Sequence, residues 1–301
     1  MVKMIDKRYG VIFRQIREQK QLSLSYFEKY GVLKSNLARF ERGETMMGFE
    51  RVVSMLQVMN ITLSDYELFF NYYLPDYQEH FLVELEKAAF SLDDMKCKKL
   101  FDEIDHSENR LLALTAKAKF DKLDQYEIEE ILEYLYRVKY WGYFELSLNY
   151  DVAEYISIVE IKDLINIFEK KTSYFYDVTK YRRKIHQIVY KIILKLCLNG
   201  DEKFANELLK STKRPERERI DFYISTLRKL TKGCVSYCFK SEQDGLLEIN
   251  QSLNLLEELG NAQLKQYYLD QVKPILMSKN INFINHKFGV LKDTNRDGGN
   301  K

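Results

Sequence analysis

The chain has 301 residues, 46 % of them hydrophobic and 31 % charged, so it is long enough to bury a sizeable core in roughly one to three domains. Its 3 prolines and 12 glycines are few, which favours long helices over a turn-rich fold. The sequence has four irregularly spaced cysteines, no apolar run of about 18 residues and no apolar segment after its first basic residues. These features argue against a disulfide scaffold, a membrane span and a secretion signal, so we expect a cytoplasmic protein.

The charge is concentrated near the start of the chain. Residues 1–51 carry 11 lysines and arginines against 6 aspartates and glutamates, a net charge of +5, whereas the whole chain carries only +2. A basic head on a slightly acidic body indicates that the head meets a polyanion and that the body meets a different partner.

The head is predicted to form a series of short helices. Apolar residues at i, i+3, i+4 and i+7 between positions 9 and 16 predict the first helix. Ser23 is a suitable N-cap for a second helix, and Gly31 is expected to end it, because glycine readily adopts the left-handed conformation that closes a helix. A fourth helix is predicted near residues 49–59.

The third helix is predicted to bury Leu33, Leu37 and Phe40, since these positions share one face. Short helices joined by a glycine turn and crossed by a third form a helix-turn-helix, whose recognition helix enters the DNA major groove. A solvated helix face is the alternative, but pattern, charge and position together favour contact with bases, since arginine and lysine suit guanine and asparagine suits adenine. The outward residues of this helix are Lys34, Ser35, Asn36 and Arg39.

The head also resembles a known family. Residues from Gly10 to about Asn71 resemble the XRE-type helix-turn-helix, and a narrower resemblance to the Rgg/GadR/MutR regulators rests on SLSYFEKYGVLKSNLARFERGE and FERVVSMLQVMNITLSDYE. The later string EIEEILEYLYRVKYWGYFELSL resembles the C-terminal half of the same family. The resemblance covers nearly the whole chain, and RFERGE is its most specific part.

The resemblance implies roles for individual head residues. Arg17 is expected to pair with Glu41 as a structural pair that locks the first helix to the third. Relatives often have serine where Leu33 stands, so a side-chain cap is expected to be missing at the recognition helix. The base-reading positions of the family correspond to Lys34, Ser35 and Arg39, and Ser35 and Asn36 are also within reach of phosphate. Arg14 and Arg42 are the best candidates for contact with the phosphate backbone.

The body is predicted to be helical throughout, because amphipathic segments alternate with short polar breaks. The predicted helices cover residues 77–90, 93–104, 108–121, 125–138, 141–155, 158–170, 177–198, 201–212, 216–239, 243–259 and 261–278. Their pairing has the size of a TPR hairpin, although no consensus TPR string occurs.

The expected fold class is therefore all-α. The expected domains are a helix-turn-helix domain over 1–71, a linker over 72–76, a helical-repeat domain over 77–285 and a flexible tail over 286–301. The resemblance implies that the repeats form a TPR-like superhelix, which binds a peptide on its concave face and dimerises.

A peptide-binding surface is predicted around residues 138–150, which are rich in aromatic and amide side chains. The Asn149 amide suits a peptide backbone because it both donates and accepts hydrogen bonds. Trp141 is a second candidate, with a core position as its more usual alternative. The basic residues considered for an acidic group of the peptide, each with a solvated face as the alternative, are Arg110, Lys117, Lys139 and Arg183.

No motif in the sequence indicates catalysis, a metal or a cofactor. The four histidines lack metal-ligating spacing, and phosphate-binding, dinucleotide and nucleophile-elbow motifs are absent. The expected function is a dimeric regulator that binds double-stranded operator DNA and is controlled by a short hydrophobic signalling peptide, as in quorum sensing. Two alternatives are a regulator whose body serves only dimerisation or a protein partner, and an enzyme anchored to nucleic acid.

The last predicted helix, 261–278, is the expected dimer surface because it carries an apolar stripe. The residues of this stripe are Leu264, Tyr267, Tyr268, Val272 and Ile275.

Overall fold

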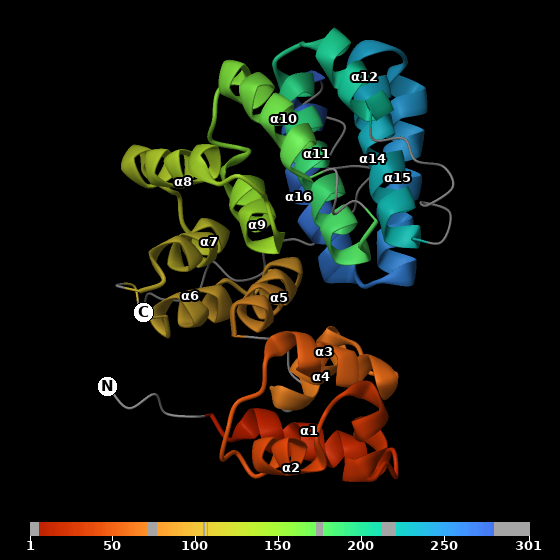
Figure 1. Cartoon of the computed structure of the whole chain (residues 1–301). Helices are drawn as coiled ribbons and strands as arrows, with labels where there is room; N and C mark the ends of the chain where they lie inside the picture. Colours follow the sequence, from red (N-terminus) through yellow and green to blue (C-terminus); the bar gives the residue numbers. More distant parts are fainter. Residues whose placement is uncertain are drawn as a thin grey trace, which may run out of the picture. The chain divides into compact units, whose positions relative to one another are not determined.

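The computed structural model describes residues 6–71, 77–104, 106, 108–172, 177–211 and 221–279, apart from the side chains of residues 166–172. Every regular element in these ranges is a helix, which confirms the predicted all-α class for the part of the chain that is described. The chain divides into two compact units, residues 1–81 and 82–301 (Figure 1). The predicted linker 72–76 and the predicted tail 286–301 lie outside the described residues.

The first unit consists of short helices. In chain order they are α1 (Arg8–Gln19), the 3-10 helix η1 (Leu24–Tyr30), α2 (Lys34–Glu41), α3 (Phe49–Val58) and α4 (Leu63–Phe70). Ser23 caps η1 by accepting a hydrogen bond from the Tyr26 amide at 3.2 Å, and Gly31 ends it with φ +77°. Helix α4, which begins at a reciprocal capping box between Thr62 and Asp65, was not predicted from the sequence.

The core of the first unit is aromatic and aliphatic, with Phe13, Phe27, Leu37 and Phe40 almost fully buried. The predicted burial of Leu33 is wrong, since its side chain is 62 % exposed. Leu33 is the N-cap residue of α2 and has extended backbone angles, so its side chain leaves the helix face that carries Leu37. The preceding residue, Val32, is buried in its place.

The second unit is an array of helices. In chain order they are α5 (Tyr77–Phe90, which enters this unit at Leu82), α6 (Asp94–Asp102), α7 (Arg110–Phe120), α8 (Gln125–Arg137), α9 (Tyr143–Val152), α10 (Ile158–Thr172), α11 (Thr179–Leu198), α12 (Glu202–Ser211), α14 (Phe222–Phe239), α15 (Glu242–Leu259) and α16 (Ala262–Lys279). Each helix predicted for the body occurs. The predicted start at 216 lies outside the described residues, and α14 begins after Asp221, whose side chain caps it.

Helix α11 lies at the centre of the second unit and packs against α9, α12, α14 and α16 (Figure 1). Consecutive helices also pack as pairs, α6 with α7 and α14 with α15 most closely. Two glycines allow the latter pair to approach: a Cβ on Gly245 would lie 2.3 Å from the Tyr237 amide nitrogen, and one on Gly233 would lie 2.9 Å from that of Ile249. No helix of the described residues is long and apolar enough to cross a membrane.

The apolar stripe of α16 faces the core of its own chain. Tyr268, Val272 and Ile275 are at most 1 % exposed, and Leu264 and Tyr267 are partly buried against the same core. The prediction that this stripe is the dimer surface is therefore wrong, because the stripe is already covered by α11, α14 and α15 within one chain.

The buried histidine of α11, His186, should make the stability of the second unit depend on pH. Burial, and then the positive charges of Arg228 and Arg182, lower the pKa of His186 from 6.5 to about 4. His186 thus stays neutral in the folded chain, whereas the unfolded chain takes up a proton below pH 6.5. Stability should therefore fall as the pH drops from 6.5 towards 4, by about 3 kcal/mol at most.

Urea unfolding followed by fluorescence of the single tryptophan, Trp141, measures this loss at pH 7, 5 and 4. His186→Gln should remove that part of the decline, whereas His106→Gln should keep it. Parallel pH profiles for His186→Gln and the parent chain would contradict the assignment.

Candidate functional site

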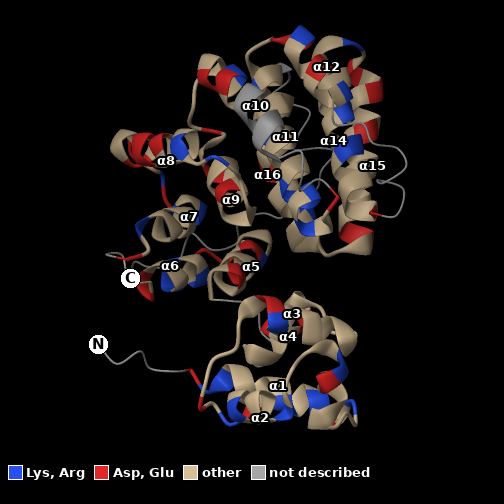
Figure 2. Ribbon diagram, viewed as in Figure 1, with Lys and Arg blue, Asp and Glu red and all other residues tan. Residues whose placement is uncertain are grey.

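The outer face of α2 gathers the polar residues that the sequence analysis assigned to DNA contact. Lys34, Ser35, Asn36 and Arg39 are exposed, while Leu37, Phe40 and Glu41 on the other side are buried. Figure 2 colours the lysine and arginine positions of α2 blue along the ribbon. The face is short, polar and positively charged, which suits a helix that enters a DNA groove.

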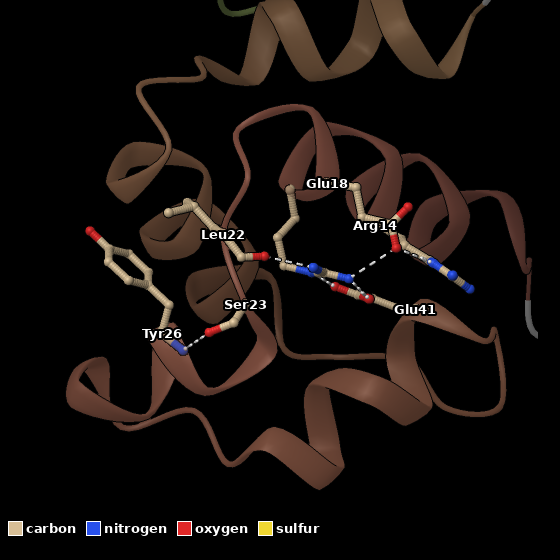
Figure 3. Close-up of polar contacts among 7 residues, drawn as sticks. Arg14, Glu18, Leu22, Ser23, Tyr26 and Glu41 are labelled. Atoms are coloured by element: carbon tan, nitrogen blue, oxygen red, sulfur yellow. Dashed lines mark hydrogen bonds and ion pairs between the residues drawn. The ribbon is translucent and has the colours of Figure 1, made fainter.

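Three of the arginines predicted to contact DNA, two at α2 and one on α1, pair with carboxylates in the structure. Arg42 Nε lies 2.5 Å and Arg39 Nε lies 3.7 Å from the Glu44 carboxylate, and Arg14 Nε lies 2.7 Å from Glu18 (Figure 3). The hydrogen bond from Arg42 lowers the pKa of Glu44. These pairs are exposed and screened by water, so a phosphate or a base can replace the carboxylate at little cost.

Helix α2 begins without a side-chain cap, as the serine-to-leucine difference at Leu33 implies. One backbone amide, that of Lys34, has a long contact of 3.4 Å to the Glu28 carboxylate. Leu33 offers no side-chain acceptor to the first backbone amides of α2, which have no partner within the helix.

Arg17 and Glu41 form a bidentate ion pair inside the first unit. Arg17 Nε and Nη2 each donate to a Glu41 oxygen at 2.7 Å, and Nη1 donates to the Leu22 carbonyl at 2.7 Å (Figure 3). The side chains are only 9 % and 4 % exposed. The hydrogen bond from Arg17 to Glu41 raises the pKa of Arg17, and the pair joins α1 to α2, as the resemblance implies.

The basic residues proposed from the sequence for an acidic peptide group are scattered over the second unit. Arg110 and Lys117 pair with Glu127, at 3.5 and 2.7 Å, while Arg183 pairs with Asp221 at 2.9 Å. The Lys139 ammonium lies 5.2 Å from the ring centre of its neighbour Tyr140. These residues do not converge on one cavity.

Trp141 is a core residue, so its proposed role in contacting a peptide is wrong. It is 0 % exposed, and its Nε1 donates to the Leu135 carbonyl at 3.1 Å. Asn149 is 1 % exposed, and its Oδ1 has no hydrogen-bond partner in the structure. Its amide lies inside the array and does not line the cavity described next.

The structure instead places a polar cavity inside the second unit, with room for about one water molecule. Its wall comes from α5, α7, α9, α11 and α16. The lining residues are Leu82, Leu85, Glu86, Ala89, Phe90, Thr115, Lys119, Ser147, Tyr150, Asp151, Lys184 and Tyr267.

Three lysines surround the ring of Tyr150 at this cavity. Their ammonium groups lie 4.8, 5.2 and 4.0 Å from the ring centre for Lys119, Lys184 and Lys191 respectively. Lysine is well placed over an aromatic ring when it is also removed from water. The phenol oxygen of Tyr150 lies 2.5 Å from that of Tyr267, so the ring is held between α9 and α16.

Each of these lysines has a carboxylate partner. Lys119 bonds to Asp151, Lys184 bonds to Glu86, and Lys191 lies 3.6 Å from Glu154. Burial raises the pKa of Asp151 although Lys119 and Lys191 oppose the shift, and burial lowers the pKa of Lys191. The cluster is thus electrically balanced in the free chain.

This cluster was not predicted from the sequence, although one signal of it is present there. Lys184, Gln187 and Lys191 stand at i, i+3 and i+7 of a helix that is buried along much of its length. Gln187 is 3 % exposed, and its Oε1 has no hydrogen-bond partner in the structure. A buried polar stripe of this kind marks a site, because buried polar groups without partners are rare.

The chain has an N-terminal helix-turn-helix with a basic outer helix, followed by a helical array with polar residues in its interior. This arrangement is typical of the class of DNA-binding proteins that carry an additional helical unit. The family model of the HTH-type transcriptional regulator Rgg, C-terminal domain, matches residues 91–270, which is more than half of the chain. The chain therefore belongs to the Rgg family of transcriptional regulators.

Solved structures share the fold at low sequence identity. A protein of Listeria monocytogenes EGD-e described as a transcriptional regulator is 14 % identical with a TM-score of 0.75, over 91 % of this chain and 99 % of that one. The SHP pheromone receptor Rgg2 of Streptococcus dysgalactiae is 20 % identical with a TM-score of 0.69, over 88 % and 99 %. ComR of S. thermophilus, solved with DNA and its signalling peptide ComS, is 10 % identical with a TM-score of 0.59, over 88 % and 99 %.

Proposed function

We propose that this chain binds operator DNA through the outer face of α2 and that a short peptide, bound at the polar cavity of the second unit, controls this binding. The observation that carries the proposal is the cavity itself, where five helices bring charged and hydrogen-bonding groups into the interior of the array. A body that served only as a scaffold would gain more stability from apolar side chains there.

The similar proteins support the same function. Rgg2 is a pheromone receptor, and ComR has been crystallised with both DNA and a signalling peptide. Helical arrays present a long inner surface that suits an extended chain. A peptide also suits the chemistry of the cavity lining, where apolar residues such as Leu85 stand beside charged residues such as Lys184.

The DNA arm of the proposal predicts a loss of specificity for Arg39→Ala. The guanidinium is 55 % exposed on the outer face of α2, where it can reach guanine. Loss of a base contact should weaken operator binding by about 1–3 kcal/mol, roughly fivefold to 150-fold. Gel shifts with an operator selected from random DNA, and with a scrambled competitor, measure both affinity and preference.

Lys20→Ala, which removes one exposed positive charge outside α2, is the matched control. It should weaken binding to the operator and to the scrambled DNA slightly and equally, because it removes only a nonspecific charge contact. An Arg39→Ala chain that keeps the operator preference of the parent would overturn the assignment of base reading to this face.

The peptide arm is tested with labelled pools of octapeptides made of Ile, Leu, Val, Phe and Gly with one variable polar position. Fluorescence anisotropy should detect saturable binding, and the bound peptide should change operator affinity in gel shifts. A ligand changes an equilibrium only through different affinities for its states, so binding without any effect on DNA would contradict control by the peptide. Absence of binding by every pool would contradict the ligand site.

A further inference from the structure

We propose that Glu86 of α5 holds, in the free chain, the position on Lys184 that a carboxylate of the controlling peptide takes when it binds. Helix α5 and the ligand would then compete for one ammonium group. This inference rests on the proposed function, because it names the chemical class of the peptide and the contact that the peptide replaces.

Lys184 is the immobile partner of this ion pair. It stands on α11, which is held on several sides by α9, α12, α14 and α16, and its side chain is 7 % exposed. A lysine in this position cannot recover its hydration by moving into water. Whenever its carboxylate partner leaves, another anion has to arrive or a charge is left buried, which is strongly unfavourable.

Glu86 is the movable partner. Its side chain is 28 % exposed, and it comes from α5, whose backbone does not lie close to any other helix of the described part of the second unit over an extended length. The buried residues Leu82 and Leu85 of α5 lie outside the main core cluster of this unit. Helix α5 meets α11 at the polar cavity, and its aromatic contact with the core of this unit is that of Phe90, at its C-terminal end, with Tyr267 and Tyr268 of α16.

The other two ion pairs at Tyr150 do not involve α5. Lys119 and Asp151 join α7 to α9, and Lys191 lies near Glu154, which closely follows α9. Of the three lysines around Tyr150, only Lys184 loses its carboxylate partner when α5 moves aside. A ligand that takes the place of α5 must consequently bring one carboxylate, either on a side chain or at its C-terminus, and its remaining contacts can be apolar.

The experiment uses the full-length chain and three fluorescein-labelled octapeptide pools of Ile, Leu, Val, Phe and Gly. One pool has a single Asp and an amidated C-terminus, the second has Asn and a free C-terminus, and the third has Asn and an amidated C-terminus. At least one of the acidic pools should bind about tenfold more tightly than the neutral pool, the gain expected for a hydrogen bond to a charged group. The acidic pool that binds more tightly than the neutral pool shows whether the carboxylate belongs to a side chain or to the C-terminus of the peptide.

Variants of the ion pair test the competition. Glu86→Gln should strengthen binding of the preferred pool about tenfold, because the ligand no longer has to displace the internal carboxylate. Lys184→Met should abolish both the preference for an acidic pool and the effect of Glu86→Gln. Glu84→Gln is the matched control, since Glu84 is on the same helix and pairs with Lys87 and Lys96 at 2.8 Å but does not line the cavity.

The failures of the two proposals are distinguishable. Equal binding of the acidic and neutral pools, or equal affinities of the Glu86→Gln and Glu84→Gln chains, would overturn the competition and leave peptide binding intact. If Lys184→Met does not fold, the comparison of Glu86→Gln with Glu84→Gln still decides the question. No binding of any pool to the parent chain or to Glu86→Gln would overturn both proposals.

Discussion

Replacing Glu41 by alanine should destabilise the first unit by about 3–5 kcal/mol, because Arg17 would lose its buried carboxylate partner and keep only the long, exposed contact to Glu18 for its charge. Four hydrogen bonds hold the Arg17 guanidinium: two to Glu41 at 2.7 Å, one to the Leu22 carbonyl at 2.7 Å and a longer one to Glu18 at 3.4 Å. Water does not easily reach the pair of Arg17 and Glu41, since both side chains are at least nine-tenths buried. Amide hydrogen exchange of α1 and α2 in the full-length chain measures the loss directly.

Two comparisons separate this effect from a general disturbance. Trp141, the single tryptophan, belongs to the second unit, so its fluorescence melt should be unchanged in Glu41→Ala. The double variant Arg17→Met, Glu41→Leu should recover most of the lost stability, since apolar residues of similar size often replace a buried ion pair without cost. Unchanged exchange in Glu41→Ala would mean that the pair contributes nothing to folding.

A second large effect is expected at Asp151, which is 2 % exposed. Asp151→Asn should destabilise the second unit by about 3–5 kcal/mol, because Lys119 would lose its partner and would remain buried near the like charges of Lys184 and Lys191. Urea unfolding followed by Trp141 fluorescence is the measurement. Asp163→Asn, at an exposed aspartate of α10, should have no effect.

The double variant Lys119→Met, Asp151→Asn completes the cycle. Its loss of stability should be smaller than the sum of the two single losses, because contacting residues are not additive. Additive losses would mean that the two side chains act independently and that Asp151 is not needed to neutralise the lysines.

Much of the fold could be predicted from the sequence because helical periodicity is a local property. Each body helix was predicted, and so was the Gly31 turn, since these depend on neighbours within a few residues. The prediction failed for Leu33, where one residue of difference in the helix start turns a side chain from the core to solvent. Helix α4 was missed because it has only 8 residues and little amphipathic pattern.

The two candidate sites differ in how far they could be foreseen. The face of α2 lies within one helix, so its residues followed from spacing alone. The cavity combines Glu86 with Lys184, which are 98 residues apart, and Lys119 with Asp151, which are 32 apart. No local pattern pairs such residues, and basic residues chosen singly, such as Arg110 and Arg183, proved to have carboxylate partners elsewhere.

The glycine contacts between α14 and α15 give the second unit a stiff end. With Gly245 against the backbone of Tyr237 and Gly233 against that of Ile249, the two helices cannot slide or roll without a collision between main chains. Side chains can change rotamer to absorb a displacement, but backbones in contact cannot. The pair α14 and α15 would thus move as one rigid body when the array is strained. The deformation would occur instead where helices meet through long, flexible side chains or beside a small cavity.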